Sequence, residues 1–152
     1  MDAKALNVPL PQLYEQDLAE WSNQTVELLR DSRFEELDIE HLIEQIEDMP
    51  KSARRELRSR MRLIIVHLLK WTQQSEKRSR SWRATLTTQR AELRTLLQES
   101  PSLRRIVPQS LDEVYSDSIK QAVAETGLPR DAFPAECPFS PAEILDPDYL
   151  PD

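Results

Sequence analysis

Apolar side chains recur three and four residues apart through most of the chain, which is the spacing of one face of an α-helix. In the most apolar stretch, Met61 to Trp71, they occupy nearly every side of the expected helix. This stretch is interrupted by three polar residues, and it is shorter than the roughly 20 apolar residues that cross a membrane. We therefore predict a central helix over residues 52–74 that other helices cover, and no membrane segment.

About four further helices are expected around this central one, which gives an all-α bundle of about five. The first spans residues 12–30, and the second begins at Asp38 and ends at Pro50, because proline disfavours a helical conformation in the residue before it. The third follows a break near Ser75 and ends before Pro101. The last ends before the only glycine of the chain, Gly127, at a position where a left-handed conformation is favoured.

Proline is frequent after Gly127, with six prolines between Pro129 and Pro151. A short helix is expected where Ser140 precedes a proline, because this pair combines a capping residue with a first-turn proline. Five apolar residues could anchor the segment to the bundle: Phe133, Phe139, Ile144, Leu145 and Tyr149. We predict a helical domain over residues 1–127 and a proline-rich tail, residues 128–152, that clasps its surface.

The acidic and basic residues are segregated along the chain, although the overall charge is −7. Residues 1–50 carry thirteen acidic and three basic residues, residues 51–105 carry four and fifteen, and residues 106–152 carry ten and two. The acidic ends could pack on the basic middle and neutralise it. Alternatively, the basic middle could form an exposed face for nucleic acid or for an acidic partner.

The single cysteine, Cys137, excludes an internal disulfide and is consistent with a reducing compartment. The first residues have neither the basic flank nor the continuous apolar region of a secretory signal. We therefore expect a cytoplasmic protein.

Several short motifs resemble, in their order along the chain, the bacterial family catalogued as domain of unknown function 29, which is largely cyanobacterial. The matching stretches are Leu13–Asp17, Leu28–Arg30, Leu37–Asp38, Leu42–Glu47, His67–Trp71, Ser81–Thr85, Ser100–Leu103, Phe133–Pro134 and Cys137–Pro138. The resemblance implies an all-helical fold and brings no established activity.

The best candidates for contact with a partner are basic residues near Trp82, because four bases and this tryptophan fall within Lys77–Arg83. Trp82 could pack in the core, or it could stack on nucleic-acid bases. The full set of interaction candidates is Arg78, Arg80, Trp82, Arg83, Arg90 and Arg94.

Three residues are candidates for a polar interior: Glu47, Arg60 and His67. We expect His67 to be a buried structural residue with a neutral, hydrogen-bonded ring, although a buried imidazole can also bind a metal. The chain shows no phosphate-binding glycine loop and no metal-ligand spacing around its two histidines. We therefore assign no catalytic residue, no metal and no cofactor.

The leading hypothesis is a module that binds another protein, or a second copy of itself. The first alternative is a nucleic-acid-binding protein that uses the basic middle third. The second alternative is a metal-dependent hydrolase that uses Glu47 and His67.

Overall fold

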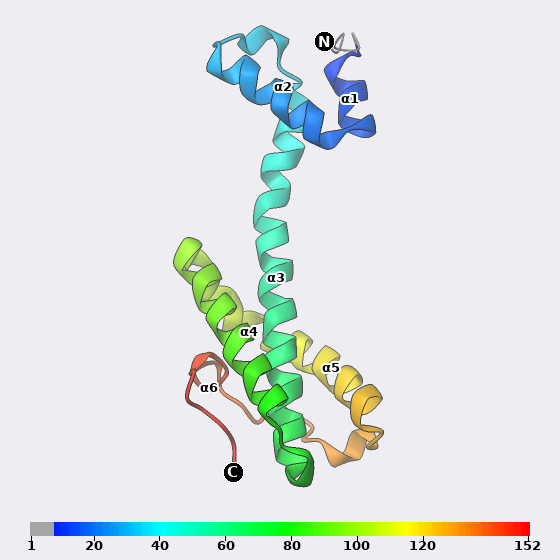
Figure 1. The fold of residues 1–152 in the computed structure, drawn as a ribbon, viewed down its shortest axis with the longest axis vertical. Coiled ribbons are helices and arrows are strands. Elements are labelled where there is room, and N and C mark those ends of the chain that lie inside the picture. The colour runs from blue at the N-terminus through cyan, green and yellow to red at the C-terminus, as the bar shows by residue number, and fades with distance from the viewer. Residues whose placement is uncertain (1–7) are drawn as a thin grey trace. The chain divides into compact units, whose positions relative to one another are not determined.

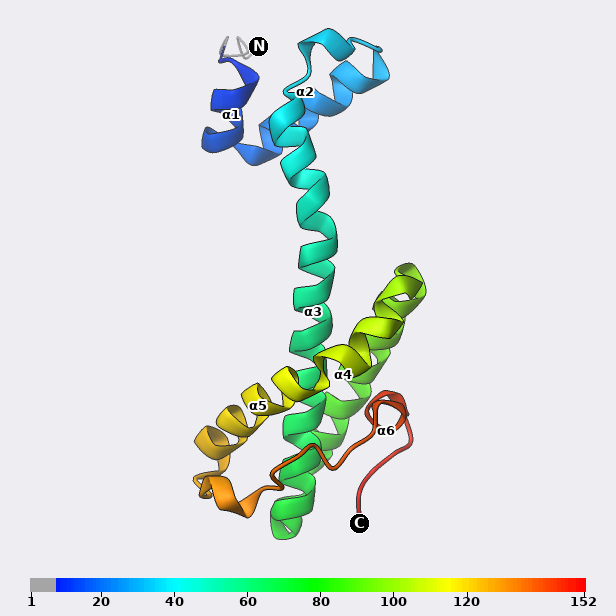
Figure 2. The ribbon, with the colours of Figure 1, turned by 180° about the vertical axis from the view of Figure 1, so that it is seen from behind.

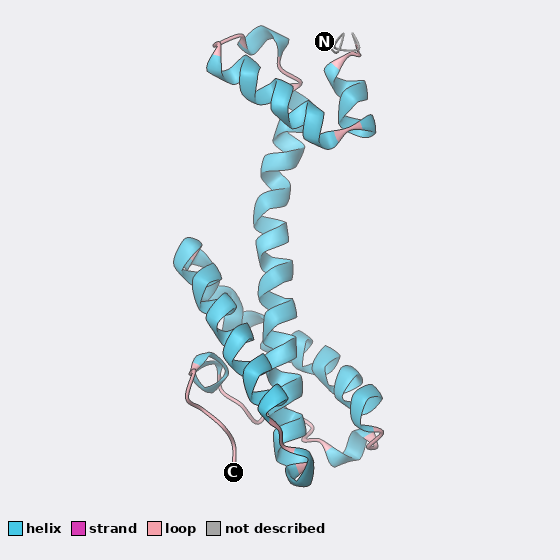
Figure 3. Ribbon diagram, viewed as in Figure 1, coloured by secondary structure: helices cyan, strands magenta, loops and turns pink. Residues whose placement is uncertain are grey.

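The computed structural model describes residues 8–152, and over this range its regular elements are all helical (Figure 3). Six α-helices are present: α1 (Leu10–Gln16), α2 (Leu18–Arg30), α3 (Ile39–Gln73), α4 (Arg80–Glu99), α5 (Ile106–Thr126) and α6 (Pro141–Leu145). The all-helical fold expected from the sequence is confirmed. No helix within residues 8–152 is long and apolar enough to cross a membrane.

The chain forms two compact units, one that ends at Lys51 and one that begins at Ser52. The first unit holds α1, α2 and the N-terminal part of α3, and α1 packs against α2 (Figure 1). The second holds the C-terminal part of α3 with α4, α5 and α6 (Figure 2). The boundary falls inside a helix, so no loop marks it, but it coincides with the change from the acidic to the basic segment of the sequence.

The predicted end of a helix at Pro50 is wrong, because Pro50 lies inside the continuous helix α3. Proline costs a helix one hydrogen bond and a clash with the preceding turn, but its fixed φ is compatible with the helical conformation. Thirty-five residues of helix, anchored by packing on both sides of Pro50, outweigh this local cost. The central helix therefore begins at Ile39 and not at residue 52.

The predicted first helix is divided at Asp17, whose extended backbone ends α1. The Asp17 carboxylate accepts a hydrogen bond from the amide of Glu20 and so caps α2. This cap was not predicted, because the apolar periodicity continues through the break.

One apolar core organises the second unit, with the C-terminal part of α3 at its centre. Met61, Ile64 and Ile65 of α3 are fully buried, as the apolar pattern predicts. The remaining helices contribute one face each, for example Leu93 of α4 and Ile119 of α5. The covered central helix is therefore confirmed for this part of α3.

The proline-rich tail adds to the same core. Phe133, Phe139 and Ile144 are buried there, so the expected clasp is confirmed. Ser140 and Glu143 form the predicted capping box at the start of α6. Gly127 ends α5 with a φ of 73°, the left-handed conformation expected of this residue.

Candidate protein-interaction surface

Large apolar side chains are exposed in one segment of the described chain. Over residues 8–152, all of them lie between Leu18 and Met49, within the first unit. They are Leu18, Val26, Leu29, Phe34, Ile39, Ile43, Ile46 and Met49. Single exposed apolar residues are normal on a protein surface, whereas a concentration of them marks an interaction site.

Helix α3 carries four of these side chains in one row. Ile39, Ile43, Ile46 and Met49 are spaced four, three and three residues apart, so they share a face of the helix. Their exposed fractions range from 50% at Ile39 to 68% at Met49. We call these four residues the apolar row. Its spacing is that of a helix face that packs against a second helix.

A cluster of aromatic and polar side chains fixes α3 against α1 and α2. Asp38 accepts a hydrogen bond from the indole nitrogen of Trp21 at 3.2 Å, and it lies 2.6 Å from Nδ1 of His41. The Tyr14 ring stacks on His41 at a centroid distance of 4.0 Å, and its hydroxyl accepts a hydrogen bond from Gln45 at 2.7 Å. These contacts occupy a different side of α3 from the apolar row, so the row remains exposed on a fixed scaffold.

His41 is held between two carboxylates. The hydrogen bond with Asp38 raises the pKa of His41, and the charge of Glu15 adds to the effect. A histidine oriented by an aspartate is half of a hydrolase triad, in which the second ring nitrogen faces a nucleophile. Here Nε2 lies 3.8 Å from a carboxylate oxygen of Glu15. His41 therefore lies between the carboxylates of Asp38 and of Glu15 on α1.

A row of carboxylates runs beside the apolar row. Glu40, Glu44 and Glu47 each follow one of its isoleucines in the sequence, and all three are exposed. Neither Glu40 nor Glu47 forms an ion pair within the part of the chain that the structure describes. We call these three residues the acidic row. The surface thus pairs an apolar row with a negative one, in which the charge of Glu44 acts on His41 and Glu40 and Glu47 have no counter-charge among the described residues.

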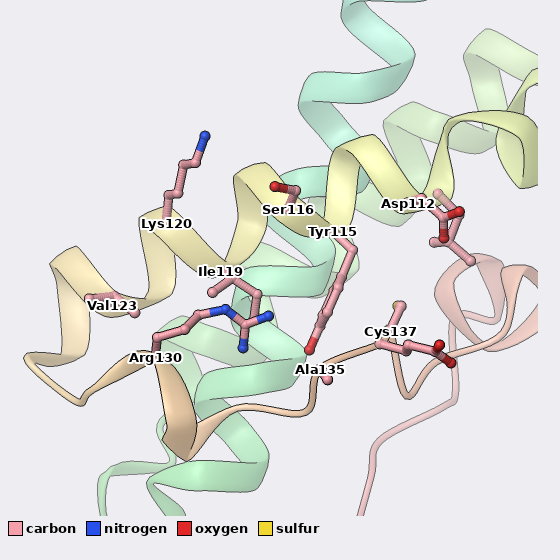
Figure 4. A pocket seen from close by; sticks show the side chains of 11 residues that line it. Asp112, Tyr115, Ser116, Ile119, Lys120, Val123, Arg130, Ala135 and Cys137 are labelled. Atoms are coloured by element: carbon pink, nitrogen blue, oxygen red, sulfur yellow. The ribbon is translucent and has the colours of Figure 1, made fainter.

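A cavity of about 1030 Å³ opens in the second unit, between α5 and the segment that follows it (Figure 4). Tyr115 and Ile119, one turn apart on α5, form its floor. Lys120 and Arg130 lie toward one end and Asp112 toward the other (Figure 4). The cavity therefore has a basic end and an acidic end.

The tyrosine hydroxyl and the cysteine thiol in this cavity both have raised pKa values. The Tyr115 hydroxyl donates a hydrogen bond to the carbonyl of Pro134 at 2.6 Å, and burial raises the pKa of Tyr115 to about 12. Burial also raises the pKa of the Cys137 thiol. Both groups stay protonated at neutral pH, and no histidine lines the cavity. Neither group therefore supplies an ionised nucleophile, and the carboxylates in the lining are those of Asp112 and Glu136.

A family model described as domain of unknown function DUF29 matches residues 13–150. The chain belongs to this family. No curated protein and no solved structure matches the chain. Because the DUF29 description names no activity, the function of this chain has to be inferred from its own geometry.

The basic residues near Trp82 in this DUF29 chain make more contacts within the protein than we expected from the sequence. Arg78 donates a hydrogen bond from Nε to the carbonyl of Trp71 at 2.9 Å, and its guanidinium carbon lies 4.9 Å from the centre of that ring. Arg83 lies 5.4 Å from the same ring centre. Trp82 is half-buried, with a lysine ammonium 4.8 Å from its ring centre. Internal cation–π contacts thus occupy aromatic faces that bases would need.

The prediction of Arg90 as an interaction residue is wrong, because Arg90 is buried with 2% of its surface exposed. Its guanidinium donates hydrogen bonds to the carbonyls of Glu143, Ile144 and Tyr149 at 2.9, 3.0 and 2.8 Å. An arginine fork suits several carbonyls that lie in one plane, including those left free at the end of a short helix. Arg90 therefore binds the chain's own tail.

The other basic candidates divide into exposed and paired residues. Arg80 and Arg94 of α4 are exposed. Arg60 is half-buried and donates hydrogen bonds to Glu56 and to Gln89 of α4, both at 3.0 Å. Arg60 therefore ties α3 to α4 as part of the interior, whereas Arg80 and Arg94 remain available to a partner.

The remaining polar candidates, Glu47 and His67, lie in different units and differ in exposure. His67 is half-buried, and its Nδ1–H donates a hydrogen bond to the carbonyl of Leu63 at 2.8 Å. Glu47 is exposed, so its prediction as an interior residue is wrong. No group of metal-ligating residues occurs within residues 8–152.

Sequence reasoning missed the apolar row as a surface feature. The residues were recognised as one helical face, but such a face is normally buried. The usable signal was the acidic residue that follows each isoleucine, because it leaves the helix flanked by charge.

Proposed function

We propose that this DUF29 chain is a cytoplasmic protein-interaction module, and that its first unit binds the partner through the exposed apolar residues of positions 18–49. The observation that carries the proposal is the confinement of exposed large apolar side chains to this segment. An exposed Ile or Met gives up about 1.5–3 kcal/mol of hydrophobic stabilisation that burial under a partner would recover.

Nucleic-acid binding by the basic middle third is the alternative, and it has less support. It requires a face of unpaired arginines, yet Arg90 is buried and Arg60 and Arg78 are hydrogen-bonded within the protein. A hydrolase has less support still, because Tyr115 and Cys137 of the cavity are held in their protonated forms and Glu47 is exposed.

Affinity purification from the native cell, with and without nuclease, tests this proposal against the alternative. The bait is the full chain, compared with Ile43→Ser/Ile46→Ser on the apolar row and with Arg80→Ser/Arg94→Ser on the basic face. All four positions are exposed, so circular dichroism and melting temperature should match the wild type.

A protein partner is expected to survive nuclease treatment, to remain with the arginine variant and to be lost with the isoleucine variant. Retention of every partner by the isoleucine variant would refute the proposed surface. Loss on nuclease treatment together with loss in the arginine variant would establish nucleic-acid binding instead.

A further inference from the structure

The chemistry of the first unit's surface also restricts what can bind there, on the premise that the proposed function holds. We infer that the partner presents an amphipathic helix with an apolar seam flanked by lysine or arginine. The inference concerns the apolar row together with the acidic row beside it on α3.

The apolar row has the dimensions of a helix–helix contact. From Ile39 to Met49 it covers about three turns, or about 15 Å of helix axis. Spacings of four, three and three residues reproduce the seam by which one helix packs along another. A partner helix of about three to four turns would cover the row along its whole length.

The acidic row fixes the charge of that helix. Glu40, Glu44 and Glu47 lie about 100° around the helix from the isoleucines that precede them, at the edge of the contact. In paired helices, residues at this edge select the partner through charge. Because Glu40 and Glu47 have no ion pair within residues 8–152, basic residues on the partner would be their first counter-charges.

A second copy of the chain does not meet this requirement. Every exposed large apolar residue of the described chain lies in the same acidic segment, so two copies joined by apolar contact would place like charges together. The exposed arginines of α4 offer no apolar seam, since Leu86, Leu93 and Leu97 of that helix are buried. An anionic lipid surface is disfavoured by the same carboxylates.

The test measures the binding of synthetic helical peptides to the full chain by isothermal titration calorimetry. Three peptides share one length: a leucine seam with lysine flanks, the same seam with glutamate flanks, and a scrambled lysine peptide without a seam. We expect the lysine-flanked helix to bind at least about tenfold more tightly than either control, as three rim charges and one apolar seam would produce.

Charge-reversed protein provides the matched control. Glu40→Lys/Glu44→Lys/Glu47→Lys should exchange the preference, so that the glutamate-flanked helix binds more tightly. Glu40→Gln/Glu44→Gln/Glu47→Gln should abolish the difference between the two. The three glutamates are exposed, and unchanged circular dichroism would show that each variant folds.

The outcomes separate the two proposals. Equal binding of both flanked helices to the wild type, or of the scrambled peptide, would overturn the inference about charge. The inference would also be overturned if sedimentation showed that the wild type is a dimer and that Ile43→Ser/Ile46→Ser abolishes this dimer. In that case the apolar row would still be a binding surface, with a second copy as the partner. Suppose that the wild type binds both flanked peptides equally, and that a native protein partner is captured by the wild type but not by Ile43→Ser/Ile46→Ser. This result would refute the present inference and leave the proposed function intact.

Discussion

At the scale of single residues, the two histidines have opposite electrostatic environments. Burial lowers the pKa of His67, and its hydrogen bond to the Leu63 carbonyl offsets only part of this. The hydrogen bond with Asp38 raises the pKa of His41. The sequence indicated the first environment, because His67 stands alone in an apolar run. We did not infer the second from the sequence, although its main cause, Asp38, lies only three residues before His41.

These shifts predict opposite effects of pH on the free energy of unfolding. The neutral ring of His67 contributes stability above its unfolded pKa of about 6.5, and this contribution is lost as the pH falls toward the lower folded value. The charged ring of His41 contributes below about 6.5, and its contribution is lost as the pH rises through the higher folded value. NMR titration should show one imidazole on each side of 6.5.

His41→Gln and His67→Gln assign the two resonances and isolate the two effects. Denaturant unfolding between pH 5 and pH 8 should lose its low-pH decline in the His67 variant and its high-pH decline in the His41 variant. Two histidines that titrate together near 6.5 would contradict both environments.

Arg90 shows how a buried charge can be structural. Replacing it with methionine leaves the carbonyls of Glu143, Ile144 and Tyr149 without their donor, and we expect a loss of about 2–4 kcal/mol in the free energy of unfolding. Arg90→Lys keeps the charge but not the planar fork, so it should lose a smaller amount. Denaturant unfolding measures both. A stability of the methionine variant equal to that of the wild type would show that the tail docks without this contact.

At the scale of the helices, ends that carry a local capping signal were more predictable than the other helix boundaries. Ser140 and Gly127 act locally, through a capping box and a left-handed backbone, so the sequence identifies both. The other two boundaries were predicted wrongly: a helix end was expected at Pro50, where α3 continues, and none was expected at Asp17, where α1 ends. Whether a helix passes through a proline, or stops inside a periodic segment, depends on packing that a local signal does not contain.

Two positions with left-handed backbone give a paired prediction. Gly127 has a φ of 73° with nothing within 4 Å of an added Cβ, so Gly127→Ala should cost about 1–2 kcal/mol from backbone strain alone. Ser32, which follows the end of α2, has a φ of 57°, so Ser32→Gly should gain up to about 1 kcal/mol. Melting temperatures should therefore move in opposite directions. Gly127→Asn should fall between alanine and the wild type, because asparagine tolerates this conformation.

At the scale of the whole molecule, the charge pattern marks the division into units better than the expected helices do. The change from acidic to basic residues at residue 50 coincides with the boundary between the units, although we expected one helical domain over residues 1–127. Lys51 and Ser52 themselves both lie in α3, so no helix end marks this boundary. The exposure of the apolar row was not predicted either. Apolar periodicity predicts which face of a helix packs, but it does not show whether that face packs within the chain or on a partner.

The concentration of the core in one unit leads to a last prediction. Leu57, Ile65, Leu93 and Ile119 belong to one buried cluster, all of whose members lie beyond Lys51. We expect the full chain to unfold in two transitions, one for each unit. A fragment of residues 52–152 should unfold cooperatively, with a melting temperature within a few degrees of the transition of the second unit in the full chain. Residues 1–51 alone should be only marginally stable, because so short a segment buries little apolar surface.

Circular dichroism and calorimetry of the two fragments and the full chain test this division. A fragment that begins at residue 45 retains nearly two more turns of α3 and so controls for fraying at the new helix end. If both longer fragments bind hydrophobic dyes and melt without a cooperative transition, the second unit depends on the first for its fold. A cooperative melt of residues 52–152, with the near-ultraviolet signal of Trp71 and Trp82 retained, would instead leave the first unit free to serve as the binding part of the molecule.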